Sequence, residues 1–183
     1  MSKDWEKEYT LKSSKETPAP ALLLKKYSHL LTGGQALDIA SGAGQNSVFL
    51  SSHSYKVTAV DKSSAAASLA NQNASDNKVQ INTVEEDILS YEIEDECYDL
   101  IADFYFLEKK IIPGIKKGLK KNGLIFFETY TIDQQNIDGP HNPDFLLNPN
   151  ELINFFTDFF IIFYHERIEN NNAVASLIAQ KVN

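Results

Sequence analysis

Cysteine is nearly absent from this sequence, because Cys97 is the only one among 183 residues. A single thiol excludes a disulfide framework within the chain and a zinc site built from cysteines. Such scarcity suits a reducing compartment, so we expect a cytoplasmic location. The four histidines are scattered, with no pair at ligand spacing on one helix. We therefore expect no metal site.

Long hydrophobic runs are also missing. No apolar stretch approaches the roughly 20 residues that a membrane-spanning helix needs. The densest stretch, 155–164, is interrupted by Thr157 and Asp158. The first eight residues lack the apolar segment of a signal peptide. We therefore expect no membrane partner.

Positive charge is in deficit, since 17 Lys and Arg stand against 25 Asp and Glu and give a net charge of −8. A polyanion would be repelled at long range, which disfavours nucleic acid as a partner. The content of 43% hydrophobic and 23% charged residues is ordinary for a globular protein. A chain of 183 residues suits one domain with a core better than two. We predict a single domain over residues 1–183.

Strand and helix patterns alternate through most of the chain. The predicted strands cover residues 36–40, 56–60, 79–84, 98–102 and 124–130, and the predicted helices cover 21–31, 45–52, 63–74 and 107–120. The last of these helices carries four apolar residues at helical spacing, Leu107, Ile111, Ile115 and Leu119. Strands that alternate with helices favour a parallel sheet with helices on both faces. Before them, the charged residues 1–20, which end in Pro18-Ala19-Pro20, predict an N-terminal arm.

The pattern changes after residue 130. Residues 131–147 are polar and rich in Asp, Asn, Gly and Pro. A structureless segment of this length inside a compact domain is typical of a lid or binding loop. Asn148, Pro149 and Glu151 then indicate the N-cap, first-turn proline and capping-box glutamate of a helix that runs to about residue 156.

Two further strands follow that helix. The patterns at 158–165 and 173–180 predict strands joined by a turn at 169–172. No crossover helix fits between them, so the chain is expected to end in an antiparallel hairpin.

The most informative segment is Leu37-Asp38-Ile39-Ala40-Ser41-Gly42-Ala43-Gly44. An apolar strand carries the acid Asp38 and is followed by two glycines that open a helix. A glycine turn lets the backbone approach a ligand closely, because no Cβ intervenes. Asp61, at the end of the next strand, is placed to accept hydrogen bonds from both hydroxyls of a ribose. Together these features predict a nucleoside-cofactor site.

Two cofactor classes fit such a turn. In nicotinamide-binding folds a third glycine lets the helix pack against the strand, but here Ser47 stands at that position. A buried acid such as Asp38 is costly without hydrogen-bond donors, which suggests that it anchors the turn or reaches a cationic ligand group. The expected C-terminal hairpin also replaces the second half of a nicotinamide fold. A nicotinamide-dependent oxidoreductase remains the less favoured alternative.

The segment 37–44 resembles motif I of the class I S-adenosylmethionine-dependent methyltransferases, and Asp61 falls at that family's ribose-binding acid. Residues 86–88, 98–103 and 119–124 resemble its adenine-side motif, its motif IV and its approach to strand five. The match covers residues 36–130. The fold implied is α/β, a Rossmann-like seven-stranded mostly parallel sheet with helices on both faces and a C-terminal antiparallel hairpin.

Within the family the chain is most similar to the small tellurite-resistance-type and thiopurine-type methyltransferases. The residues that carry this likeness are Trp5, Tyr9, the segment 142–147 and Glu151-Leu152. The sequence departs from the family pattern at Ala40, which replaces the first motif glycine, and at Asn122, where Pro-Gly is usual. Alanine is small enough for the turn to survive.

The resemblance implies an enzyme that transfers a methyl group from S-adenosylmethionine to a small-molecule acceptor, leaving S-adenosylhomocysteine. The implied acceptor is a chalcogen oxyanion or a thiol. The cofactor-binding residues it implies are Asp38, Ala40, Gly42, Gly44, Asp61, Lys62, Asp87, Ile88 and Asp103. The candidates on the substrate side are Asp103, Tyr105, Glu128 and His141, with no general base assigned. The protein is expected to be a monomer or homodimer. The alternative is a non-catalytic cofactor-binding or regulatory protein that kept the fold.

Overall fold

The computed structural model describes residues 5–11, 19–139 and 141–182 of the chain. The chain forms two compact units, Met1–Glu92 and Ile93–Asn183. Of the predicted arm, residues 1–4 and 12–18 lie outside the described residues, as does residue 140 of the predicted loop. In the arm, Trp5–Thr10 forms a short helix, α1.

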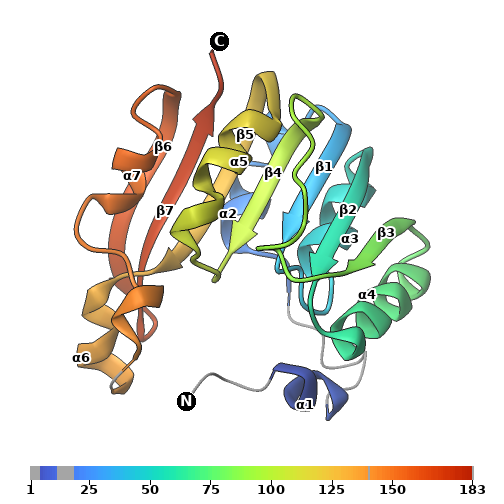
Figure 1. Ribbon diagram of the computed structural model, residues 1–183, viewed down its shortest axis with the longest axis horizontal. Coiled ribbons are helices and arrows are strands. Elements are labelled where there is room, and N and C mark those ends of the chain that lie inside the picture. The colour runs from blue at the N-terminus through green and yellow to red at the C-terminus, as the bar shows by residue number, and fades with distance from the viewer. Residues whose placement is uncertain (1–4, 12–18, 140, 183) are drawn as a thin grey trace. The chain divides into compact units, whose positions relative to one another are not determined.

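Three parallel strands form the sheet of the first unit, β1 (Gly34–Ile39), β2 (Tyr55–Asp61) and β3 (Ile81–Glu85), in the order β3-β2-β1 (Figure 1). The last four residues of β1 are all buried. Such continuous burial is typical of a parallel strand covered on both faces. The predicted strands 36–40, 56–60 and 79–84 are confirmed to within two residues at each end.

Helices connect these strands. The helix α3 (Gln45–Ser52) has the predicted bounds, and α4 (Ser64–Asp76) lies within two residues of them. The cap of α4 explains its start, because the Ser63 hydroxyl accepts the backbone N–H of Ala66 at 3.0 Å.

The helix predicted over 21–31 is too long. The helix α2 (Leu22–Lys26) ends at Tyr27, whose φ of −107° and ψ of 25° leave the helical region. A 3₁₀ turn, η2 (Ser28–Leu30), continues the segment.

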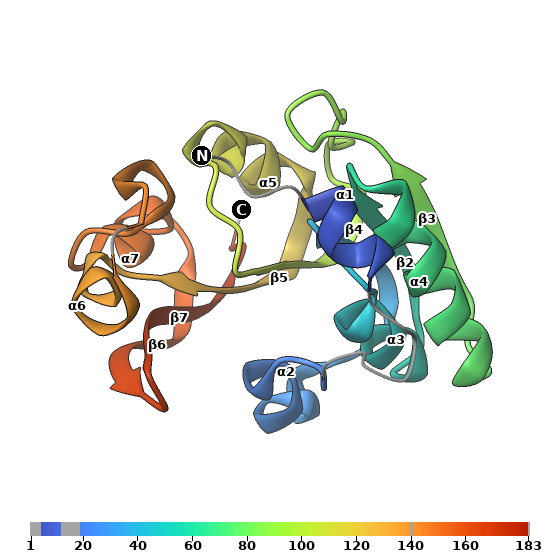
Figure 2. The same ribbon diagram turned by 90° about the horizontal axis from the view of Figure 1, so that it is seen from below.

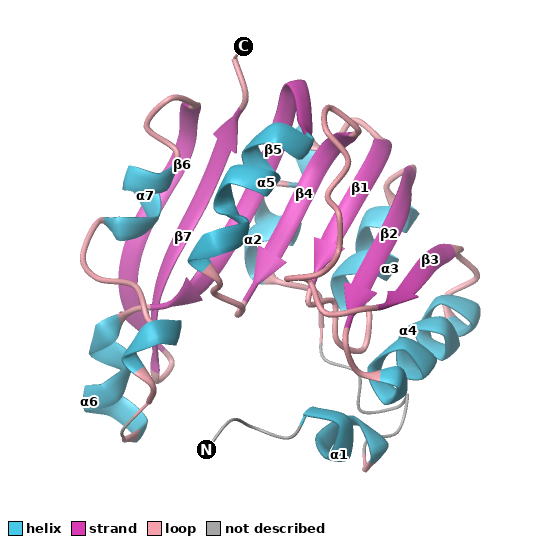
Figure 3. Cartoon of the chain, in the orientation of Figure 1, coloured by secondary structure: helices cyan, strands magenta, loops and turns pink. Residues whose placement is uncertain are grey.

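The second unit has four strands, β4 (Tyr98–Phe104), β5 (Leu119–Tyr130), β6 (Phe160–Glu169) and β7 (Asn172–Gln180), in the order β4-β5-β7-β6 (Figure 3). β4 and β5 are parallel, whereas β7 is antiparallel to both β5 and β6. Asn170 and Asn171 join β6 to β7 with φ values of 51° and 60°. Two consecutive left-handed residues are the requirement of a tight hairpin turn, and asparagine tolerates that conformation.

These strands confirm the predicted fold class, a seven-stranded, mostly parallel sheet with a C-terminal antiparallel hairpin. In the part of the chain that the structure describes, no helix has both the length and the apolar character to cross a bilayer.

The helix predicted over 107–120 is the largest error in the second unit. A 3₁₀ turn, η3 (Lys109–Ile111), leads into α5 (Ile112–Gly118), which has Pro113 in its first turn. Proline has no N–H, so an α-helix cannot run through it from residue 107 with its hydrogen bonds intact. The four apolar residues that suggested the helix are nevertheless all buried. β5 also begins five residues earlier than predicted.

The loop predicted over 131–147 is not structureless. It contains η4 (Ile132–Gln134), α6 (Gln135–Asp138) and η5 (Pro143–Phe145). A parallel bridge between Thr131 and Leu147 closes its base.

The next helix, α7 (Glu151–Phe155), begins after Asn150 and not at the predicted cap, Asn148. Glu151 Oε2 does accept the backbone N–H of Asn148 at 2.9 Å, as a capping-box glutamate would. Asn150, with φ of 62°, has no side-chain hydrogen bond to the helix.

Candidate cofactor site

The turn between β1 and α3 is built from residues in the left-handed region. Ala40, Gly42 and Gly44 have φ values of 49°, 54° and 75°. The backbone N–H of Ser41 donates to Val60 O on β2, and that of Gly44 donates to Ser41 O, both at 3.0 Å. Glycine adopts such φ values without cost, whereas Ala40 carries steric strain.

The two glycines are required for different reasons. A Cβ on Gly44 would lie 2.7 Å from Ala70 Cβ, so this glycine lets the turn pack against α4. A Cβ on Gly42 would overlap the hydroxyl oxygen of Tyr9 and lie 3.3 Å from its ring carbon Cζ. The bare backbone of Gly42 therefore faces α1.

Asp61 ties the end of β2 to this turn. Its Oδ2 accepts the backbone N–H of Gly42 and its Oδ1 that of Ser63, each at 2.9 Å. Each carboxylate oxygen can accept a further hydrogen bond, since it has two lone pairs. The predicted pairing of the glycine turn with Asp61 is thus present as a direct contact.

Asp38 lies beneath the turn and is 1% exposed. The Ser47 hydroxyl donates to its Oδ2 at 2.5 Å. Burial raises the pKa of Asp38 to about 7, and the hydrogen bond from Ser47 opposes that rise. Asp38 therefore anchors the start of α3 through Ser47.

The loop after β3 reaches the same end of the sheet. The backbone N–H of Glu86 donates to Asp61 O at 3.1 Å. Asp87 is exposed, with its Oδ1 accepting the backbone N–H of Leu89 at 3.0 Å, while Ile88 is buried. Lys62, next to Asp61, is exposed.

These residues fit a nucleoside ligand. Asp61 supplies acceptor oxygens for vicinal hydroxyls, and the turn has no side chain at Gly42. Gln45, the first residue of α3, adds a buried Oε1 that accepts no hydrogen bond from any described residue. A buried acceptor without a partner is costly, and a donor on a ligand would satisfy it.

The substrate-side candidates belong to the second unit, and two of them are in contact. Tyr105, directly after β4, has φ of 60° and donates its hydroxyl to Glu128 Oε1 at 2.9 Å. Burial and the neighbouring Glu128 hold the pKa of Tyr105 well above its usual range. Asp103, at the end of β4, is fully buried.

Glu128 is held by groups that sequence patterns did not indicate. Its Oε2 pairs with Nη2 of Arg167 at 2.9 Å and accepts the Ser176 hydroxyl at 2.5 Å. Arg167 and Ser176 come from β6 and β7, so only strand pairing brings them to Glu128. The one sequence signal available for this cluster was the alternation of side chains along β6 and β7, because it predicts which residues share a face of the sheet.

His141 does not join this group in any described contact. It is exposed, with its Nε2 2.7 Å from Asp138 Oδ1 in the loop after β5. The hydrogen bond from His141 lowers the pKa of Asp138 below its usual value. Among the described residues, no group of three His, Cys, Asp or Glu side chains could hold a metal ion.

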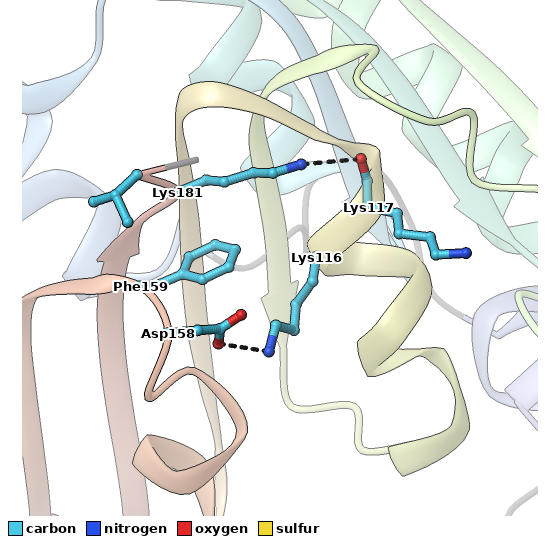
Figure 4. Close-up of a pocket in the computed structure, with 6 residues that line it drawn as sticks. Lys116, Lys117, Asp158, Phe159 and Lys181 are labelled. Atoms are coloured by element: carbon cyan, nitrogen blue, oxygen red, sulfur yellow. Dashed lines mark hydrogen bonds and ion pairs between the residues drawn. The ribbon is translucent and has the colours of Figure 1, made fainter.

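A pocket of about 250 Å³ in the second unit contains none of the predicted site residues (Figure 4). Its lining residues are Lys116, Lys117, Asp158, Phe159, Lys181 and Val182. Lys116 Nζ donates to Asp158 Oδ1 at 2.6 Å, and Lys181 Nζ donates to Leu119 O at 2.6 Å. Two of its three lysines are therefore engaged by acceptors of the protein itself.

The sheet, the glycine turn and the acid at the end of β2 define a class, the Rossmann-like fold of the class I methyltransferases. The crystal structure of TehB from Haemophilus influenzae has this fold, with a TM-score of 0.75 and 24% identity over 97% of this chain and 67% of that one. The chain belongs to the TehB family, whose model, described as tellurite resistance protein TehB, matches residues 5–175. The match extends well beyond residues 36–130, into α1 and β7.

Two curated relatives agree with this assignment. A probable S-adenosyl-L-methionine-dependent methyltransferase, TehB of Haemophilus influenzae, is 27% identical over 164 residues, which cover 80% of this chain and 57% of the relative. A ubiquinone biosynthesis O-methyltransferase of Pasteurella multocida is 33% identical over 114 residues, 54% of this chain and 47% of the relative. The chain thus spans little more than half the length of TehB.

Proposed function

We propose that the protein transfers a methyl group from S-adenosylmethionine to a small-molecule acceptor, either a chalcogen oxyanion or a thiol. The observation that carries the proposal is the contact between Asp61 and the backbone of Gly42. This contact presents a carboxylate and a side-chain-free turn to one ligand, as recognition of a ribose requires. The names of the relatives, a probable methyltransferase and a tellurite resistance family, support the same assignment.

The first unit would hold the cofactor. Asp61 accepts the ribose hydroxyls, and Gly42 and Gly44 contact the ligand through their backbone, next to Ala40 and Lys62. Three further residues of this unit are proposed to contact the cofactor: Asp87 and Ile88 on the adenine side, and Asp38 toward the methionine ammonium group through water. Asp103, on β4 of the second unit, stays a predicted cofactor residue.

The protein's task is then orientation. When bound, S-adenosylmethionine supplies a methyl group that the adjacent positively charged sulfur already activates. Holding two reactants in line can contribute about 7–11 kcal/mol to lowering such a barrier. The polar groups proposed to act on the acceptor side are Asp103, Tyr105, Glu128 and His141.

The state of two of these groups supports the proposed acceptor class. The Tyr105 hydroxyl stays protonated because its pKa is raised, and Glu128 is paired with Arg167. Neither is therefore poised as a general base. A thiolate or an oxyanion of selenium or tellurium is already deprotonated and needs no general base, whereas an alcohol must lose its proton when it is methylated, which favours this class over alcohols.

Calorimetric titration with S-adenosylhomocysteine, with NAD as control, tests the cofactor. We expect micromolar affinity for S-adenosylhomocysteine and none for NAD. Asp61→Ala should weaken that affinity at least tenfold, about 1.4 kcal/mol. The matched control Asp76→Ala, at the far end of α4, should bind as the wild type does. Unchanged affinity of Asp61→Ala would refute the ribose assignment.

A turnover assay tests the reaction. Purified protein with S-adenosylmethionine and tellurite, selenite or a thiol should form S-adenosylhomocysteine and methylated acceptor in equal amounts. Tight cofactor binding without turnover on any of these acceptors would favour the non-catalytic alternative.

A further inference from the structure

Tyr105 holds a strained backbone conformation in the second unit. Its φ of 60° lies in the left-handed region, which a bulky side chain rarely adopts. Its backbone N–H donates to Glu128 O at 2.7 Å, and its hydroxyl donates to Glu128 Oε1 at 2.9 Å. One residue of β5 thus fixes both the backbone and the ring of Tyr105. Strain of this kind persists only where the surrounding structure imposes it, and it is typical of functional sites.

Glu128 is fixed in turn by a closed ring of hydrogen bonds. The residue is 2% exposed, and a buried carboxylate is costly unless donors compensate its charge. Arg167 Nη2 and the Ser176 hydroxyl both donate to Glu128 Oε2, and Arg167 Nη1 donates to Ser176 Oγ. We call Glu128, Arg167 and Ser176 the clamp. They come from three strands, β5, β6 and β7, which lie side by side (Figure 2).

Arg167 is the only arginine of the chain. Its planar guanidinium donates from two nitrogens to two neighbouring acceptors, which the single ammonium group of a lysine does not reproduce. Its third nitrogen, Nε, lies 3.5 Å from Oε2 of the exposed Glu169. An exposed ion pair of this kind contributes little. The contribution of Arg167 therefore lies in the clamp.

The hydroxyl of Tyr105 is bound to the clamp, whereas its ring is accessible. Burial and the charge of Glu128 raise the pKa of Tyr105, so the hydroxyl stays protonated and remains a donor. The residue is nevertheless 49% exposed, and its ring lies against that of Tyr130, with the centroids 5.2 Å apart and the planes at 44°. Polarizable sulfur packs favourably against aromatic rings. The two rings therefore suit the soft atom of a chalcogen acceptor.

We propose that Arg167 and Ser176 are positioning residues of the acceptor site, which fix Glu128 so that it holds the ring of Tyr105 against the acceptor. The inference rests on the proposed function and deepens it, because Tyr105 contacts the acceptor through its ring while its hydroxyl serves as an anchor. Without the clamp, Tyr105 relaxes to an ordinary φ and the ring leaves its place. Affinity for the acceptor then falls. Affinity for the cofactor stays, because Asp61 and the glycine turn belong to the other compact unit.

Steady-state kinetics measure this effect, with the acceptor that is methylated fastest among tellurite, selenite and dithiothreitol. Arg167→Lys keeps the charge but loses the paired donors, and it should raise the KM for the acceptor about two- to tenfold, the order of one hydrogen bond. Ser176→Ala is a smaller change to the clamp and should raise this KM within the same range. Glu169→Gln is the matched control, because it removes only the exposed partner of Arg167 and should leave the KM unchanged. All three variants should bind S-adenosylhomocysteine with the wild-type Kd in calorimetry.

A double-mutant cycle separates positioning from a general effect on the fold. Tyr105→Phe removes the hydroxyl through which the clamp acts, and it should itself raise the KM for the acceptor about two- to tenfold. In that background Arg167→Lys should add little, whereas independent effects would multiply. Hydrogen exchange of the Tyr105 amide is a second readout that needs no acceptor. It should become faster in Arg167→Lys and Ser176→Ala and keep its wild-type rate in Glu169→Gln.

The outcomes distinguish this inference from the function on which it rests. A wild type that methylates none of the three acceptors would overturn both. Wild-type turnover with an unchanged KM in Arg167→Lys and Ser176→Ala would overturn the positioning role alone. Multiplying effects in the double variant, or a weaker Kd for S-adenosylhomocysteine in the clamp variants, would also overturn it, because Arg167 would then support the fold as a whole and not the ring of Tyr105.

Discussion

Ala40 holds a conformation that favours glycine. Its φ of 49° lies in the left-handed region, which costs an L-residue roughly 1–2 kcal/mol. Glycine would remove that strain but lose about 0.5–1 kcal/mol through the entropy of the unfolded chain. We expect Ala40→Gly to stabilise the protein by about 0.5–1 kcal/mol, measured by urea denaturation.

The neighbouring alanine provides the control for this substitution. Ala43 lies in the same turn but is not among the residues with positive φ, and it is buried. Ala43→Gly should therefore destabilise the protein. A loss of stability in both variants would show that the strain at Ala40 does not set the stability of the turn.

Asp38 makes the stability depend on pH. Its pKa is about 7 in the folded protein, through burial, and near 3.8 in the unfolded chain. Between these values the folded state binds more protons, so this group's contribution to stability falls as pH rises from about 4 to 7. The nearby negative charge of Asp61 acts in the same direction.

Asp38→Asn should remove that dependence. Asparagine still offers Ser47 an acceptor oxygen but carries no charge to bury. The variant should gain stability relative to the wild type between pH 5.5 and pH 8 in urea denaturation. The exposed Asp95→Asn should follow the wild-type profile. Parallel profiles for Asp38→Asn and the wild type would contradict a titrating Asp38.

At the scale of elements, the loop after β5 combines a fixed base with an open tip. Ile132 N–H donates to Leu147 O at 2.9 Å, and the Gln134 side chain accepts the Ala173 N–H from β7 at 2.7 Å. At the tip, residues 141–145 are all exposed, including Phe145 at 53%. An exposed aromatic ring on a loop with a fixed base suits a lid that closes over a ligand.

We expect this tip to become protected from hydrogen exchange when cofactor and acceptor are both bound. Protection should rise in residues 135–139 and 141–145 but not in 131–134, whose hydrogen bonds already exist. Peptides from β7 serve as the internal reference. Equal exchange of the tip in free and loaded protein would show that it is not a lid.

Elements governed by local patterns were predicted well. The strand, turn and helix from β1 to α4 follow from continuous apolar runs, glycines and the Ser63 cap, and their bounds agree to within two residues. The helix predicted over 107–120 was wrong because the prediction used the spacing of the apolar residues and neglected the missing N–H of Pro113. The predicted start of the next helix, with Asn148 as its cap, was wrong because Asn150 takes a left-handed φ and the helix begins at Glu151.

The site was predictable only where its residues lie in one motif. Gly42, Gly44 and Asp61 follow from strand ends, since parallel strands bring their carboxyl ends to one edge. The position of Tyr9 over Gly42 depends on a contact between elements more than thirty residues apart, which no local pattern encodes. The pairing of Glu128 with Arg167 depends in the same way on the register of β6 and β7.

For the whole molecule, we propose that residues 1–183 unfold as a single domain. One family model spans residues 5–175 and so includes strands of both compact units. One cooperative transition of 183 residues should absorb about 130 kcal/mol near 60 °C, with equal calorimetric and van't Hoff enthalpies. Two independent units would give a van't Hoff enthalpy near half the calorimetric one.

Adding a ligand helps to distinguish one cooperative unit from two in this measurement, because every predicted cofactor residue except Asp103 lies in Met1–Glu92. S-adenosylhomocysteine at a hundred times its Kd should raise the free energy of unfolding by about 2.7 kcal/mol. That gain should raise the midpoint temperature of the single transition by roughly 5–10 °C, whereas NAD should leave this temperature unchanged. If the units unfold separately, the ligand would shift only the part of the heat absorption that belongs to the first unit. Such a split would refute the single domain while still locating the cofactor in that unit.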